Sequence, residues 1–159
     1  MQTEYSLWTR NPEIAVLEAC RELGTAFVAF SPLGRGFLCG ELRDLASLGA
    51  HDLRRGMPRF QPDTYPANLK LLDGLSAVAN EQHCTLSQLA LAWLLAKAPH
   101  IIPIPGTRSI AHLQDDLGAV NVTLDATTMQ RLDTLINRHN VAGARYDAAA
   151  QAGADTEEF

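Results

Sequence analysis

The order of apolar runs and helix patterns constrains the fold of this chain more than any other feature. Residues 25–30 and 101–104 are short apolar runs, and each ends in a bend rich in glycine and proline. Residues 2–6 give a weaker strand signal, because polar and apolar side chains alternate there. A loop and a helix pattern follow each of these segments. Strands that alternate with helices pair in parallel through right-handed crossovers, so we predict an α/β fold. The run at 25–30 is apolar throughout, which predicts a strand buried on both faces.

Helix boundaries are predicted from capping residues and from apolar residues spaced at helical intervals. Asn11, followed by Pro12 and Glu13, predicts a helix over residues 12–23. Further helices are predicted from residue 66, over 86–98 behind a Thr85–Gln88 capping box, from Ser109 to about 117, and from Asp125 through 136. Residues 37–65 lack a clear period, so we expect a long loop with room for one short helix.

Composition and charge exclude several classes of protein. With 47% hydrophobic and 19% charged residues, the chain has ordinary globular composition. A formal net charge of −5 argues against nucleic-acid binding, and no apolar run reaches the ~20 residues that span a membrane. The three cysteines form no CxxC pair, and the five histidines show no metal-binding spacing, so we expect no metal site. A reducing, cytoplasmic location fits this cysteine usage best.

Two bends carry residue types that suit an anionic ligand. Ser31–Gly36 combines small residues with Arg35, and 105–109 places Arg108 at the start of a helix. Ligands bind at the carboxyl ends of strands in parallel α/β folds, and a helix N-terminus with an arginine favours anions. Together the bends favour a phosphate-bearing cofactor. From spacing alone, each bend could equally be a plain turn, and Phe30 could be a core residue.

Five strings in this sequence resemble the aldo-keto reductase family, and they occur in the family's order. They are QTEYSL at 2–7, FVAFSPLGRG at 27–36, MPRFQ at 57–61, QLALAW at 88–93 and PIPGTR at 103–108. The resemblance extends to about residue 146, so we expect one domain over 1–146 and an irregular tail over 147–159. It implies a partial (β/α)8 TIM barrel, with three parallel strands and their helices corresponding to the last three of eight units.

The resemblance also implies an NADP(H) cofactor and assigns residues to it. It gives Gln2 to the nicotinamide carboxamide, Phe30 to the nicotinamide ring and the Ser31 bend to the pyrophosphate. Asp115 and Asp116 fall where the family usually carries Glu and Asn against the adenine, and a carboxylate at 116 can only accept hydrogen bonds. The expected cofactor-binding residues are Gln2, Phe30, Ser31, Leu33, Gly34, Arg35, Arg59, Gly106, Thr107, Arg108, His112, Asp115 and Asp116.

The family's catalytic Asp, Tyr, Lys and His belong to earlier strands and loops, so the resemblance assigns no catalytic residue here. We therefore expect the C-terminal, cofactor-binding part of an NADP-dependent reductase of aldehydes and ketones, inactive as an isolated chain. The alternatives are an NADP(H)-binding or subunit-association fragment without catalysis, or an inactive product of a truncated or split gene. Three strands leave two open sheet edges, which predicts pairing with a separate N-terminal fragment or self-association, besides a small carbonyl substrate.

Overall fold

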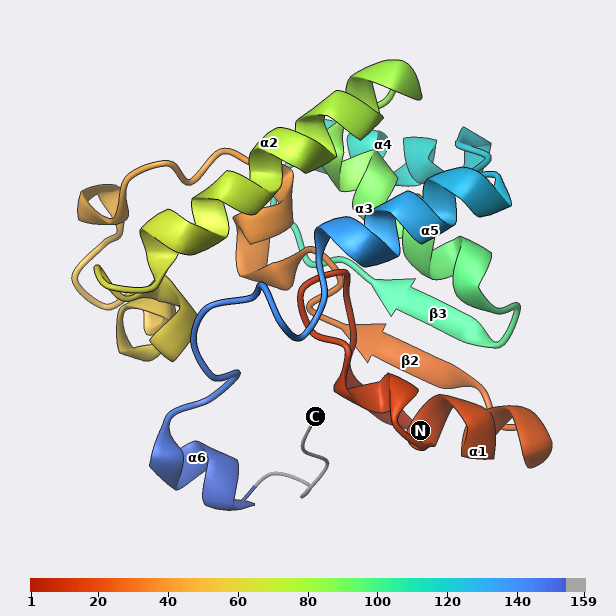
Figure 1. Cartoon of the computed structure of the whole chain (residues 1–159), viewed down its shortest axis with the longest axis horizontal. Helices are drawn as coiled ribbons and strands as arrows, with labels where there is room; N and C mark the ends of the chain where they lie inside the picture. Colours follow the sequence, from red (N-terminus) through yellow and green to blue (C-terminus); the bar gives the residue numbers. More distant parts are fainter. Residues whose placement is uncertain (154–159) are drawn as a thin grey trace.

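A three-stranded parallel sheet lies at the centre of the structure. The structure is a computed structural model, and it describes residues 1–153. The strands β1 (Gln2–Glu4), β2 (Phe27–Phe30) and β3 (Ile101–Ile104) follow one another across the sheet in chain order, and Figure 1 shows β2 and β3 side by side. Their carboxyl ends are in register, with Glu4 beside Phe30 and Phe30 beside Ile104. The predicted α/β fold with three parallel strands is confirmed.

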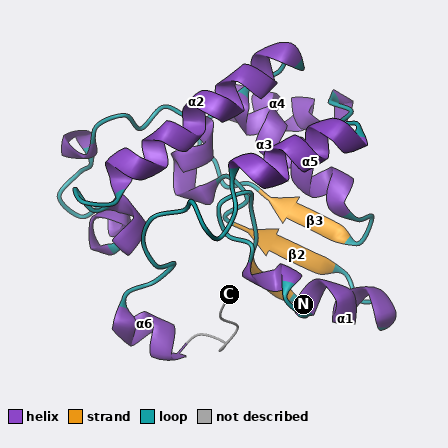
Figure 2. Ribbon diagram, in the orientation of Figure 1, coloured by secondary structure: helices purple, strands orange, loops and turns teal. Residues whose placement is uncertain are grey.

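Residues 1–153 form six α-helices, and Figure 2 shows helices in purple against the orange strands. Thr85 and Gln88 form the predicted capping box, and the Ser109 and Asp125 side chains each accept a hydrogen bond from a backbone N–H of the helix that follows. These three helix starts are confirmed, because each cap satisfies backbone donors that the first turn leaves free. The helices are α1 (Val16–Glu22), α2 (Tyr65–Glu81), α3 (Leu86–Lys97), α4 (Ile110–Gly118), α5 (Ala126–Leu135) and α6 (Ala148–Gly153).

The helix predicted over 12–23 is divided in two. Asn11–Glu13 forms a 3-10 turn, Ala15 leaves helical geometry, and α1 begins at Val16. Asn11 is therefore not the cap of a continuous helix. The Glu13 carboxylate accepts hydrogen bonds from the Tyr5 hydroxyl and from Arg10, which hold the turn against the core apart from α1.

Two other expectations about irregular segments need correction. The segment from 34 to 60 contains four 3-10 stretches where one short helix was expected: Gly34–Cys39, Leu45–Ser47, Leu53–Gly56 and Pro58–Phe60. Within the tail expected to be irregular, residues 148–153 form α6. Residues 154–159 of that tail lie outside the described residues.

The sheet buries one face, and the prediction that β2 is buried on both faces is wrong. Phe27 and Ala29 are fully buried, and the Tyr5 ring lies between Phe27 and Trp93 of α3. On the other face, Val28 and Phe30 are half-buried, and Ile102 and Ile104 are 48% and 43% exposed. The reason is that, within residues 1–153, packed side chains cover only the first face. Along the described chain, β1 and β3 each also keep one unpaired edge.

Two kinds of feature are absent from residues 1–153. None of their helices combines the length and the apolar character needed to cross a membrane. None of their groups of His, Cys, Asp and Glu side chains could hold a metal ion.

Candidate functional site

The two bends singled out by the sequence line one cleft of about 670 Å³. Phe30 and Ile104, the last residues of β2 and β3, both contribute to it, so the cleft opens at the carboxyl ends of the strands. The first bend follows β2 and the second joins β3 to α4. Parallel pairing places both bends at the same edge of the sheet, which is why residues more than 70 positions apart meet there.

The first bend has a backbone that residues with side chains rarely adopt. Ser31 and Arg35 have φ values of 47° and 56°. The two glycines on either side of Arg35, Gly34 and Gly36, have φ values of 57° and 87°. A left-handed non-glycine residue costs on the order of 1 kcal/mol, and such strain often accompanies a binding site. Successive turns of this kind expose backbone N–H groups in a concave surface that suits an anion.

The second bend satisfies part of its own backbone but leaves Arg108 open to a ligand. The side chain of Ser109 caps α4 by accepting from the His112 backbone N–H at 3.3 Å, and Thr107 accepts from the Ser109 N–H at 3.1 Å. No atom lies within 4 Å of the place where a Cβ on Gly106 would stand. Arg108 is exposed, and it has no hydrogen bond or ion pair with any described residue. This helix N-terminus therefore offers an uncommitted positive charge.

An acidic pair lines the cleft near α4 and α3. The Asp115 carboxylate accepts from the Thr85 hydroxyl at 2.9 Å, which ties α4 to the start of α3. Asp116 is only 8% exposed, and burial, together with the neighbouring Asp115, raises the pKa of its carboxyl group. The cleft therefore combines basic and acidic residues.

Nine of the thirteen expected cofactor-binding residues line this cleft, and four do not. Gln2 is exposed and lines a separate hollow near the start of β1. Gly34 is buried under the Trp8 ring, and Arg108 projects into solvent. Arg59 donates to the Trp8 carbonyl oxygen and to the Thr9 hydroxyl. The residues in the cleft are Phe30, Ser31, Leu33, Arg35, Gly106, Thr107, His112, Asp115 and Asp116.

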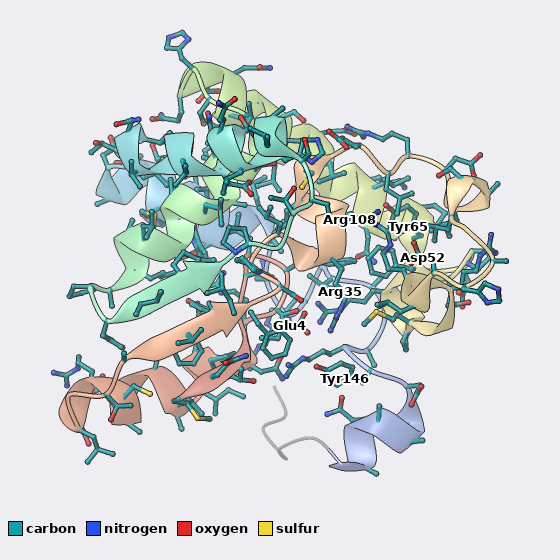
Figure 3. All side chains as sticks on the ribbon, turned by 180° about the vertical axis from the view of Figure 1, so that it is seen from behind. Glu4, Arg35, Asp52, Tyr65, Arg108 and Tyr146 are labelled. Carbon is teal, nitrogen blue, oxygen red and sulfur yellow. The ribbon has the colours of Figure 1, made fainter. Side chains whose placement is uncertain are left out.

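Arg35 lines the cleft, yet its guanidinium already has an acidic partner. Its Nη2 donates to Glu4 Oε2 at 2.9 Å, and Glu4 is 4% exposed. Figure 3 shows Glu4 and Arg35 close together, with Tyr146 approaching the same carboxylate, where its hydroxyl lies 3.5 Å from Oε2. This ion pair joins the end of β1 to the first bend, so Arg35 has a structural role whether or not it also touches a ligand.

Sequence reasoning assigned no cofactor role to several other residues that line the cleft, Arg54 and Ser87 among them. Arg54 Nη1 donates to the Arg35 carbonyl oxygen at 3.1 Å. Its guanidinium is held by Asp52, and these hydrogen bonds lower the pKa of that carboxyl group to about 2. Ser87 and Cys39 also line the cleft, and burial raises the pKa of the Cys39 thiol. No periodic signal in residues 37–65 could have located Arg54 in the cleft.

Comparisons with known proteins agree with this geometry. The family described as "Aldo/keto reductase family" matches residues 1–137. The chain is 39% identical over 153 residues to "Aldo-keto reductase yakc [NADP(+)]" of Schizosaccharomyces pombe, covering 94% of this chain and 45% of that relative's length. Among solved structures, the thermostable aldo-keto reductase Tm1743, in complex with the inhibitor epalrestat, is 30% identical with a TM-score of 0.60, over 84% of this chain and 38% of that one.

Two further solved structures are similar to this chain. An aldo-keto reductase from Klebsiella pneumoniae in complex with NADPH is 26% identical with a TM-score of 0.60, over 92% of this chain and 42% of that one. A glycerol dehydrogenase from Gluconobacter oxydans, 23% identical, shares the fold with a TM-score of 0.75, over 87% of this chain and 42% of that one. This chain thus matches less than half the length of each of these proteins. The convergent bends, the parallel strands and the match over residues 1–137 show that the chain belongs to the aldo/keto reductase family.

Proposed function

We propose that this chain is the NADP(H)-binding part of an aldo-keto reductase that reduces aldehydes or ketones to alcohols. The convergence of the Ser31 and Gly106 bends on one cleft is the observation that carries this proposal. The similar proteins named above add support, because the Schizosaccharomyces pombe relative is named for NADP(+) and the Klebsiella pneumoniae structure contains NADPH.

The residues in the cleft fit a phosphorylated dinucleotide. The bend from 31 to 36, in which Ser31, Gly34, Arg35 and Gly36 have left-handed backbones, forms a concave wall that suits a pyrophosphate, and the N-terminus of α4 suits a second phosphate. The exposed, unpartnered Arg108 would then select NADP(H) over NAD(H), because the 2′-phosphate is the difference between them. Asp115 and Asp116 would face the adenosine, with Asp116 accepting a hydrogen bond where the family's amide both donates and accepts.

Phe30 is the residue we assign to the nicotinamide ring. It ends β2, lines the cleft and is half-buried, so one ring face is available to a ligand. The nicotinamide, when bound, supplies a hydride to a carbonyl carbon. Phe30 would orient the ring and exclude water from it.

We propose that the chain alone has no turnover and that carbonyl reduction requires the β/α units that the longer relatives contain in addition. The open edges of β1 and β3, and the exposed Ile102 and Ile104 side chains, support association with those units, supplied by another chain or by self-association. The same exposed face also supports the alternative of an NADP(H)-binding or subunit-association protein without catalysis. All three cysteines are free, which supports a cytoplasmic location.

Fluorescence titration with NADPH and NADH tests the binding proposal. We expect saturable binding of NADPH, and we expect Arg108→Ala to weaken NADPH about tenfold while changing NADH little, because one charge-assisted contact to a phosphate is lost. Arg21→Ala, which removes an exposed arginine of α1 paired with Glu18, is the matched control and should leave both affinities unchanged. Equal weakening of both dinucleotides by Arg108→Ala would contradict the assignment.

An NADPH-oxidation assay with a reactive aldehyde tests the proposed inactivity. We expect no turnover above the rate without protein. Turnover at the rate of an intact reductase, lost on Phe30→Ala, would show that the chain is an enzyme by itself.

A further inference from the structure

A second cleft, of about 360 Å³, lies apart from the dinucleotide cleft and is rich in arginine. The loop after β1, the Pro58–Phe60 turn and the segment from 137 to 145 form its walls. Four arginines line it, and among the residues that the structure describes no Asp or Glu does. The arginines are Arg10, Arg59, Arg138 and Arg145.

Two of these arginines are already committed to partners. Arg10 forms ion pairs with Glu13 and Asp133. Arg138 donates to the His139 ring at 3.1 Å. Arg59 and Arg145 remain, and both lie near one carboxylate, that of Glu4.

The acidic side chains near Arg59 and Arg145 do not fully neutralise the positive charge of these two arginines. Arg59 donates only to neutral oxygens, those of Trp8, Thr9 and Gly143. Burial, with Arg145 and Arg35 nearby, lowers the pKa of Arg59 to about 10, so it is still protonated at neutral pH.

Arg145 pairs with Glu4 at 3.3 Å, but Glu4 also pairs with Arg35 at 2.9 Å. Arg59 also interacts with Glu4 electrostatically. The Glu4 carboxylate thus faces three guanidinium groups, those of Arg35, Arg59 and Arg145.

Trp8 adds an independent observation that points to a ligand. It lines the arginine-rich cleft and is 3% exposed, and its ring stacks on Phe37 at 3.9 Å while Arg59 lies 5.2 Å from its ring centre. Its indole Nε1 is buried without a hydrogen-bond partner in the described structure. Trp93, by contrast, donates its indole N–H to Asp133 at 3.0 Å. Buried donors are almost always paired, so the Trp8 N–H lacks an acceptor that a ligand could supply.

The outer wall of this cleft is held in place. The Asn68 side chain donates to the Ala142 carbonyl oxygen and accepts from the Ala142 N–H, both at 2.9 Å. A Cβ on Gly143, where φ is +90°, would lie 2.8 Å from the Pro58 carbonyl oxygen, so only glycine allows this close approach. Arg145 lies two residues further along, and its Nε donates to Glu4 Oε2 at 3.3 Å.

We propose that this arginine-rich cleft binds the carboxylate group of a small molecule, with Arg59 and Arg145 as charged donors and the Trp8 indole N–H as a neutral donor. A carboxylate has two oxygens in one plane, which matches the planar fork of a guanidinium and leaves lone pairs for a third donor. The site is separate from the dinucleotide, and its occupancy does not depend on the dinucleotide proposal.

The two tryptophans give a direct test by ¹⁵N–¹H NMR of the full chain, titrated with succinate. We expect succinate to shift the Trp8 indole resonance saturably and to leave that of Trp93 in place, with the two peaks assigned from a Trp93→Phe variant. Uncharged succinamide should shift neither. Arg145→Gln should weaken succinate at least about tenfold, as expected for a lost charge-assisted hydrogen bond, and Arg145→Lys should recover part of that loss. Arg21→Gln is the charge-matched control and should bind like the unaltered chain.

Three results of the succinate titrations would overturn the proposal. They are a Trp8 resonance that does not move with succinate, equal shifts by succinate and succinamide, and unchanged affinity in Arg145→Gln when its thermal melt shows a folded protein. Arg108→Ala should bind succinate normally, which separates this site from the dinucleotide cleft.

The last six residues include Asp155, Glu157 and Glu158. A chain that ends at Gly153 should therefore bind succinate no more weakly than the full chain, and loss of binding there would also count against the proposal.

Discussion

Glu4→Gln tests whether a single buried carboxylate balances the arginines at the end of β1. Glu4 is 4% exposed and accepts from Arg35 at 2.9 Å, from Arg145 at 3.3 Å and from the Thr9 hydroxyl at 3.0 Å. The substitution preserves the shape of the side chain. It removes the negative charge and leaves one acceptor oxygen where the carboxylate offers two.

The expected loss of stability is large. Removing one partner of a buried ion pair costs about 3–5 kcal/mol, because the remaining charge is left uncompensated. The Arg35 and Arg145 side chains retain 21% and 15% exposure, so solvent relieves part of this cost and we expect the lower end, about 3 kcal/mol. A domain of this size has about 5–15 kcal/mol in total, so much of its stability would be lost.

Urea unfolding followed by circular dichroism measures this loss. Glu18→Gln on α1 is the matched control, since Glu18 forms an exposed ion pair with Arg21 and its loss should cost less than about 1 kcal/mol. If Glu4→Gln and Glu18→Gln lowered the free energy of unfolding equally, the buried cluster would not contribute as we argue.

Three further predictions follow from single residues. Burial and Asp115 raise the pKa of Asp116, so the folded chain holds that proton more tightly than the unfolded chain, and stability falls as the pH rises above the ordinary aspartate value of about 3.9. Asp116→Asn should therefore be more stable than the unaltered chain at pH 7 but not at pH 3, by urea unfolding; a difference that does not depend on pH would refute this. Burial raises the pKa of the Cys39 thiol, so its alkylation by iodoacetamide at pH 8, followed by mass spectrometry, should be several-fold slower than that of a cysteine peptide, and slower still with NADPH in the cleft. Asp125→Ala removes an acceptor 2.7 Å from the Thr128 N–H and should cost about 1 kcal/mol, or a melting temperature lower by about 2–4 °C, whereas Asp63→Ala, at an exposed position, should change it little.

Structural features that depend on residues close together in the chain could be predicted from the sequence. The caps at Thr85, Ser109 and Asp125 were predicted because a cap needs only a side chain and the backbone N–H two or three residues further along. The strands at 27–30 and 101–104 were predicted from apolar runs bounded by glycine and proline. The meeting of the two bends followed from strand direction, since parallel strands end at one edge.

What the sequence could not predict depends on contacts between distant residues. The strand β2 is buried on one face and not on the other, and this depends on which packed side chains cover the described sheet. Arg54 in the dinucleotide cleft and Arg59 outside it both come from a segment without periodicity, and their positions depend on partners such as Asp52 and Trp8.

The order of the strands and helices, the caps of α3, α4 and α5, and the family could be read from the sequence, because each depends on residues close together in the chain or on a matched series of short motifs. The pairing of Arg35 with Glu4, and the return of Arg145 from the other end of the chain to the same carboxylate, became visible in the folded chain alone. Charge pairing over such separations has no sequence period, because packing of the intervening elements brings the groups together.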